Sequence, residues 1–169
     1  MKGKPSDEVS DALRGPKGST IELKVERAGQ EKTISITRDE IKLADVPYFG
    51  MLSNGTTGYI KLNGFTQTAS AEVIAAYGKL KQQGMTSLVL DLRGNGGGLL
   101  IEAVKIVNVF VKKGQTVVTT KGRIPEENRT YSTSADALDL TIRLVVLVDG
   151  GSASASEIVS VSLQDLDRA

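Results

Sequence analysis

The first forty residues alternate apolar and polar positions with the periods of one helix and two strands. The pattern predicts a helix, a strand, a turn and a second strand, at residues 6–13, 21–26, 28–31 and 34–36. Ser6 is placed to cap the helix, and Gly15-Pro16 ends it. One helix and one hairpin bury too little apolar surface to fold alone, so this unit must have partners.

After a connection at 39–57, the rest of the chain alternates between strands and helices. Strands are predicted at 58–62, 87–92, 115–121 and 143–148, and helices at 70–82, 100–110 and 158–166. The strand at 87–92 is apolar at nearly every position, which is expected when both faces of a sheet are covered. The order of elements is typical of an α/β layer. We therefore expect an α/β fold, with a small unit at 1–42 and a main domain at 43–169.

Composition narrows the class of protein. The chain has 169 residues, 40% of them hydrophobic, which is enough for a sizeable core. Its net charge of +1 and its 4% aromatic content argue against nucleic acid as a partner. The longest unbroken apolar run, Leu144 to Val148, is far too short to span a membrane. The amino end also lacks the apolar core of an export signal.

The absence of two residue types limits the chemistry. With no histidine, the chain cannot form a Ser-His-Asp triad or a histidine-containing zinc site. With no cysteine, it has no thiol nucleophile and no disulfide. Catalysis within this chain must use serine, threonine, lysine, tyrosine or carboxylates, and we expect neither a metal nor a cofactor.

Two loops could carry such chemistry. The first, Asp91 to Gly98, is rich in glycine and lies between a buried strand and a helix, where backbone N–H groups favour negative charge. It does not match a nucleotide-binding motif, and a tight turn is the simpler explanation. The second, Asp149 to Glu157, contains three alternating serines before a helix. Each serine could be a nucleophile at a strand-to-helix corner or simply a helix cap, and capping alone explains the run more simply.

Considered together, the loops favour a site. Both follow apolar strands and open helices, so in a parallel layer they fall at the same carboxyl edge, where sites collect. One loop could supply a serine and the other backbone N–H donors for an oxyanion. With no histidine, the general base would have to be a lysine.

The motifs in these loops closely resemble those of the C-terminal processing peptidases, also called tail-specific proteases. The matching segments are 3–5, 13–18, 58–62, 90–99, 145–159 and 163–165. The resemblance implies a crotonase- or ClpP-like core domain preceded by the second half of a PDZ domain. It also implies a serine endopeptidase that cleaves protein or peptide substrates near their C termini, in the periplasm or cell envelope.

The same resemblance assigns roles to individual residues. Ser154 matches the nucleophile, and the N–H groups of Ala155 and Gly98 match the oxyanion hole, with Gly97 a weaker candidate donor. Asp165 matches an acidic position that is important in some members, and the sequence supports no more than a structural role for it.

Two parts of the family pattern have no counterpart in the sequence. The family's catalytic lysine lies downstream of the serine, but none of the residues after Ser154 is lysine, and the carboxylate-gripping half of the PDZ domain does not match either. We therefore expect an inactive fragment of a longer Ser-Lys peptidase. Two alternatives remain open: a non-catalytic module that binds peptides or lipophiles, and a crotonase-type acyl-CoA enzyme that would not need Ser154.

Overall fold

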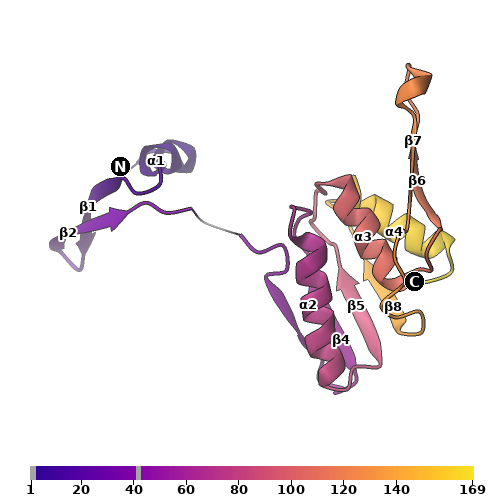
Figure 1. Ribbon diagram of the computed structural model, residues 1–169. Helices are drawn as coiled ribbons and strands as arrows, with labels where there is room; N and C mark the ends of the chain where they lie inside the picture. The colour runs from indigo at the N-terminus through magenta and orange to yellow at the C-terminus, as the bar shows by residue number, and fades with distance from the viewer. Residues whose placement is uncertain (1–2, 41–42) are drawn as a thin grey trace. The chain divides into compact units, whose positions relative to one another are not determined.

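The computed structural model describes residues 3–40 and 43–169 (Figure 1). The chain divides into two units, Met1–Lys42 and Leu43–Ala169. The expected boundary after residue 42 thus falls at a segment, 41–42, that lies outside the described residues.

The first unit consists of one helix and one hairpin. Helix α1 (Ser6–Leu13) precedes strands β1 (Thr20–Arg27) and β2 (Gln30–Thr37), which pair in antiparallel fashion. Ala28 and Gly29 form the two-residue turn, both with positive φ, which suits the twist of a hairpin. The prediction that Ser6 caps α1 is wrong. Pro5 occupies the cap position in an extended conformation, so Ser6 is already the first helical residue.

The first unit has no buried core. None of its described residues is buried, and the apolar side chains of Ile34 and Ile36 on β2 are exposed. This confirms the expectation that a helix and a hairpin alone bury too little apolar surface.

The second unit is built on a four-stranded sheet in the order β3-β4-β5-β8. Its strands are β3 (Tyr48–Met51), β4 (Thr57–Lys61), β5 (Ser87–Asp91) and β8 (Arg143–Leu147). The last three are parallel, and β3 is an antiparallel edge strand. Strand β3 lies within the stretch predicted to be a connection, and that part of the prediction is wrong. At four residues, β3 is too short to show alternation, and it forms by pairing with β4.

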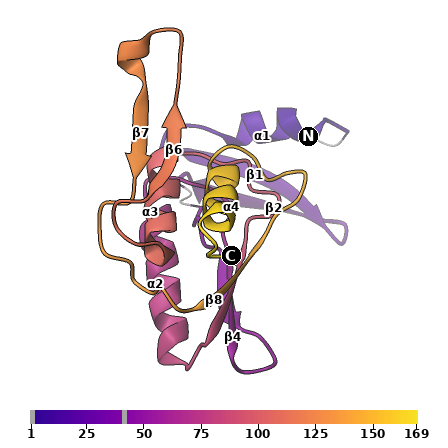
Figure 2. The same ribbon diagram turned by 90° about the vertical axis from the view of Figure 1, so that its right-hand side faces the viewer.

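Three helices accompany the parallel strands. These are α2 (Ala69–Gln82), α3 (Leu100–Phe110) and α4 (Ala155–Asp165). Helices α2 and α3 lie side by side on one side of the sheet (Figure 2). Leu88 and Leu90 of β5 face this layer and are fully buried within the core. None of the described helices is long and apolar enough to cross a membrane.

The opposite face of the sheet is less buried. Tyr59, Val89 and Val145 stand in one row across β4, β5 and β8. Tyr59 and Val89 are half-buried, and Val145 is 52% exposed. The expectation that both faces of strand 87–92 are covered is therefore wrong for the described residues. The apolar character of this strand reflects a buried face and a half-buried one.

Strands β6 (Thr116–Thr120) and β7 (Arg129–Ser132) form a separate antiparallel hairpin. A short 3-10 turn, η1 (Pro125–Glu127), lies between them, and the hairpin projects from the body of the second unit (Figures 1 and 2). At its base the Ser162 hydroxyl donates to the Val117 carbonyl, with 3.0 Å between the oxygens. The predicted strand at 115–121 thus exists but is not part of the α/β layer. Its partner β7 is short and polar, so the sequence carried no apolar signal for it.

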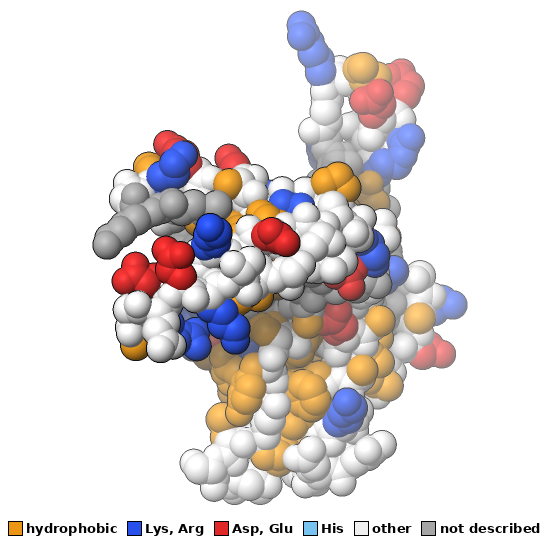
Figure 3. Space-filling view, turned by 90° about the vertical axis from the view of Figure 1, so that its left-hand side faces the viewer, with side chains coloured by type: hydrophobic (Ala, Val, Ile, Leu, Met, Phe, Trp, Pro, Cys, Tyr) orange, Lys and Arg blue, Asp and Glu red, His pale blue; other side chains and the backbone are white. Residues whose placement is uncertain are grey.

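Charge is mixed on the face of the molecule that Figure 3 draws. On the face drawn in Figure 3, the side chains of Lys and Arg are interspersed with those of Asp and Glu. This distribution agrees with a net charge of +1. Such a face has no single-sign field that would attract a polyanion.

A buried carboxylate marks the carboxyl end of β5. Asp91 is 1% exposed and accepts hydrogen bonds from the Arg93 guanidinium and backbone and from the Tyr59 hydroxyl, the last at 2.6 Å. The hydrogen bonds from Arg93 hold the pKa of Asp91 well below its usual range, although burial acts in the opposite direction. The ionised form of Asp91 therefore stabilises the turn into the glycine-rich loop.

Leu90→Ala should destabilise the second unit by about 2–5 kcal/mol, because it leaves a cavity at the centre of the sheet. Urea unfolding followed by circular dichroism measures the change. Val145→Ala, in the neighbouring strand but half-exposed, should cost less than about 1.5 kcal/mol. Equal losses in the two variants would contradict the assignment of the core to the helix-facing side of the sheet.

Asp91→Asn should make the free energy of unfolding less dependent on pH in the acid range. The pKa of Asp91 is depressed in the folded state, so its contribution is fully present above the unfolded value of about 3.9 and is lost as the pH falls through the folded value. The stability difference between the native chain and the variant should therefore be largest near pH 7 and shrink below about pH 4. Urea midpoints measured from pH 7 to pH 2 test this, and a constant difference would refute it.

Candidate active site

The two loops singled out in the sequence meet at the carboxyl edge of the sheet. The parallel ladder continues past the strand ends, since the Leu92 N–H donates to the Leu147 carbonyl at 2.8 Å. Beyond it, the Gly94 N–H donates to the Asp149 carboxylate, also at 2.8 Å. The prediction that both loops share one edge is confirmed.

Asp149 joins the two loops through one carboxylate oxygen. Its Oδ1 accepts the N–H groups of Gly94 and Gly151, at 2.8 and 2.9 Å. These two backbone hydrogen bonds lower the pKa of Asp149. Asp149 thus remains ionised at neutral pH and closes the turn that leads into the serine run.

The three serines of the run have different environments. The hydroxyls of Ser152 and Ser156 each donate to a carbonyl of the glycine-rich loop at 2.8 Å, on Leu92 and Asn95 respectively. Ser156 is completely buried and Ser152 half-buried, whereas Ser154 is exposed. Only Ser154 therefore combines exposure with a position at the corner between strand and helix.

The backbone of Ser154 has an uncommon conformation. Its φ of 55° and ψ of −114° belong to a region that glycine favours and that costs other residues about 1–3 kcal/mol. Ser154 is the N-cap of α4, and the Glu157 carboxylate accepts its N–H at 2.6 Å. Ser154 therefore caps a helix and also sits on a sharp, strained corner between strand and helix. The helix begins at Ala155, three residues before the predicted start.

The glycine-rich loop passes directly against Ser154. Gly97 has a φ of 99°, and a Cβ added there would lie 2.8 Å from the Ser154 Cβ and 3.0 Å from the Ala155 nitrogen. Any side chain at this position would collide with the serine corner. Residue 97 must therefore be glycine for the two loops to approach so closely.

The hydrogen bonds of the glycine-rich loop show whether the N–H group of Gly97 or that of Gly98 is available to an oxyanion. The Gly97 N–H already donates to the Asn95 side chain at 2.9 Å. By contrast, within the described ranges 3–40 and 43–169, no acceptor is found for the N–H of Gly98 or of Ala155. This pattern favours Gly98 and Ala155 over Gly97 as the groups available to an oxyanion.

Asp165 is not brought to this corner. It is exposed and ends α4, eleven residues after Ser154, which corresponds to about 16 Å along a helix axis. Among the described residues, Asp165 has no hydrogen bond or ion pair that joins it to Ser154.

No lysine approaches Ser154 through a hydrogen bond within the part of the chain that the structure describes. Lys61, at the end of β4, donates to the Arg93 carbonyl and pairs with Asp91 at 3.4 Å. Lys61 therefore stabilises the turn after β5.

Three residues of the site were missed in the sequence, namely Asn95, Asp149 and Glu157. Glu157 had a readable signal, because a glutamate three residues after a serine is a capping box. Asn95 and Asp149 act through contacts between loops that lie far apart in sequence. No local sequence pattern predicts such contacts.

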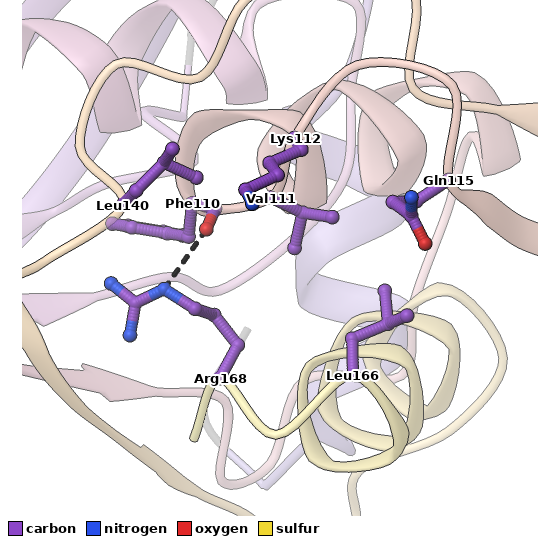
Figure 4. Close-up of a pocket in the computed structure, with 7 residues that line it drawn as sticks. All are labelled: Phe110, Val111, Lys112, Gln115, Leu140, Leu166 and Arg168. Atoms are coloured by element: carbon purple, nitrogen blue, oxygen red, sulfur yellow. Dashed lines mark hydrogen bonds between the residues drawn. The ribbon is translucent and has the colours of Figure 1, made fainter.

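A hollow elsewhere in the second unit is not part of this site. It has a volume of about 360 Å³ and is lined by Phe110, Val111, Lys112, Gln115, Leu140, Leu166 and Arg168 (Figure 4). Arg168 crosses one side and donates to the Phe110 carbonyl at 2.9 Å. These residues cluster around the carboxyl ends of α3 and α4, whereas Ser154 lies at the amino end of α4.

Known proteins are similar to this chain in both sequence and fold. The chain is 41% identical over 168 residues to a "Probable CtpA-like serine protease" of Staphylococcus epidermidis, covering 99% of this chain and 33% of that protein. A protein of the same name from Staphylococcus aureus is 40% identical, with 100% and 34% covered. The chain thus spans about a third of the length of these curated relatives.

Among solved structures, a photosystem II D1 C-terminal processing protease is similar, with a TM-score of 0.67 and 31% identity over 96% of this chain and 45% of that one. A Bacteroides fragilis structure described as an S41 protease has a TM-score of 0.64 and 22% identity, covers 95% of this chain and 48% of its own, and supports the fold alone. The family model of peptidase family S41 matches residues 56–169, which include both loops of the site. The chain therefore belongs to peptidase family S41.

Proposed function

We propose that this chain carries the nucleophile and the oxyanion hole of a serine endopeptidase that cleaves proteins near their C termini. The observation that carries the proposal is the strained, exposed corner at Ser154. It packs against a loop in which the Gly98 N–H has no acceptor among the described residues. The names of the relatives, a CtpA-like serine protease and a C-terminal processing protease, support the same reaction class.

In the proposed reaction, the Ser154 hydroxyl attacks the carbonyl carbon of the scissile peptide. A bond forms between Oγ and carbon while the hydroxyl proton passes to a general base, and the N–H groups of Ala155 and Gly98 hold the oxyanion. The C–N bond then breaks, and the base returns the proton to the leaving amine. Water attacks the resulting acyl-enzyme in the same way and releases the acid.

We propose that the base is a lysine located outside residues 1–169, which completes a Ser-Lys dyad in a longer protein. Two observations support this: Ser154 has no hydrogen bond to a lysine among the described residues, and the chain spans a third of its curated relatives. In this proposal residues 1–169 alone are inactive.

The remaining parts of the proposal concern architecture and location. The helix and hairpin of residues 1–42 would be the second half of a PDZ-like domain. Other segments of that domain would cover their apolar side chains. Residues 43–169 would form a crotonase- or ClpP-like core, and the protein would act in the periplasm or cell envelope. The exposed apolar residues of the first unit support the first of these statements.

Ser154→Ala should lower peptide cleavage by at least about 10³-fold in a protein extended to include the downstream lysine, because the bond-forming oxygen is removed. Thermal unfolding should change little, since Ser154 is exposed. Ser152→Ala and Ser156→Ala should lower activity much less, because their hydroxyls donate to backbone carbonyls and form no bond with the substrate. If Ser152→Ala abolished turnover while Ser154→Ala did not, the nucleophile would be misassigned.

Residues 1–169 alone should show no cleavage of casein, because proton transfer by a general base typically contributes about 10²–10⁴ in rate. Extension through the downstream lysine should restore cleavage. Casein cleavage by the short chain that disappears in Ser154→Ala would show that an internal lysine completes the site. A rise in the melting temperature with a coenzyme A thioester would instead favour the acyl-CoA alternative.

A further inference from the structure

Asn95, in the glycine-rich loop, contacts the end of β4, its own loop and the serine run. Asn95 is 0% exposed and lies within the loop, four residues after the end of β5. Its side-chain Nδ2 donates to the Leu62 carbonyl, at the end of β4, and its Oδ1 accepts the Gly97 N–H, both at 2.9 Å. The side chain thus fixes the glycine-rich loop to the sheet.

The backbone of Asn95 holds the serine run. Its carbonyl accepts the Ala153 N–H at 3.1 Å and the Ser156 hydroxyl at 2.8 Å, on the two sides of Ser154. The same residue therefore sets the position of both loops that would hold an oxyanion.

The next peptide group, Gly97–Gly98, is held by Phe65. The Gly97 carbonyl accepts the N–H of Phe65 at 3.2 Å, so the N–H and the carbonyl of Gly97 are both held. A trans peptide is planar, and its N–H points away from the preceding carbonyl. The Gly98 N–H must therefore point away from Phe65. Gly98 has a φ of 148°, and Gly97 a φ of 99°, so this stretch depends on external contacts to hold one conformation.

We propose that Asn95 is a positioning residue of the oxyanion hole. Its side chain fixes the Gly97 N–H while Phe65 holds the Gly97 carbonyl, and the two contacts together direct the Gly98 N–H toward the carbonyl attacked by Ser154. The carbonyl of Asn95 sets the distance to the Ala155 N–H. This inference rests on the proposed function for its catalytic meaning. The hydrogen bonds that it requires exist independently of catalysis.

The first experiment measures the loop directly, by amide hydrogen exchange of residues 1–169 followed by NMR. In Asn95→Ala, exchange of the Gly97 amide should rise at least about tenfold, because its acceptor is gone, while the amides of β5 change little. Asn108→Ala is the matched control. Asn108 lies near the carboxyl end of α3, accepts the N–H groups of Ser134 and Ala135, and donates to the Ala135 carbonyl. None of these bonds involves the two loops of the site. Unchanged exchange at Gly97 in Asn95→Ala would overturn the inference, whatever the protein catalyses.

The second experiment measures the oxyanion hole with an N-acetyl-Ala-Ala-alanine aldehyde, labelled with ¹³C at the aldehyde carbon. An aldehyde has no leaving group, so its hemiacetal with Ser154 is an equilibrium adduct that needs no general base to be stable. Asn95→Ala should weaken the adduct about 10²-fold, as expected when an oxyanion donor is misplaced, and Asn108→Ala less than about threefold. Wild-type affinity in a folded Asn95→Ala would overturn the inference.

A second variant keeps the test decisive if Asn95→Ala does not fold. Asn95→Asp retains an oxygen for the Gly97 N–H and loses the donor to Leu62, so it should protect the Gly97 amide and weaken the adduct less than Asn95→Ala. An Asn95→Asp protein that protects the Gly97 amide yet binds the aldehyde no better than Ser154→Ala would contradict the inference. If the wild-type chain forms no Ser154-dependent adduct, the proposed function loses its support, and the exchange measurement still decides the role of Asn95 in the loop.

Discussion

The parallel pairing of β5 between β4 and β8 is the constraint on which the second unit depends. It places the ends of two strands, 56 residues apart in sequence, next to each other, as the contact between the backbones of Leu92 and Leu147 records. The loops that follow must then turn away at the same edge, and α3 and α4 start from there. Burial of Leu88 and Leu90 beneath the helices stabilises this pairing, so the core of the fold and the position of the serine corner have one cause.

The serine corner itself is locally unfavourable and is held by its surroundings. A non-glycine residue with the φ and ψ of Ser154 persists only where neighbouring contacts over-determine the backbone. Here these contacts are hydrogen bonds from several directions: Glu157 within the helix, and Asn95 and Asp149 across the two loops. The corner is therefore a product of tertiary structure, which agrees with a role beyond capping.

Sequence patterns predicted the long elements and the meeting of the two loops, because periodic apolar positions and glycine clusters are local signals. They failed where tertiary contacts decide. Strand β3 forms by pairing with β4, and β7 by pairing with β6, although neither is apolar and long enough to be recognised. The resemblance to a family selected Ser154 from the run, and the residues alone could not. The structure distinguishes the three serines by what each hydroxyl contacts, information that no spacing contains.

The left-handed φ of Ser154 also discriminates between hydroxyl side chains. Threonine offers the same nucleophilic oxygen, but its β-branched side chain restricts χ1 and makes a positive φ far more costly than it is for serine. At this corner the backbone conformation therefore favours serine over threonine, independently of the reaction. A nucleophile held in this way can be exchanged for alanine or cysteine without added backbone strain, but not for its nearest chemical analogue.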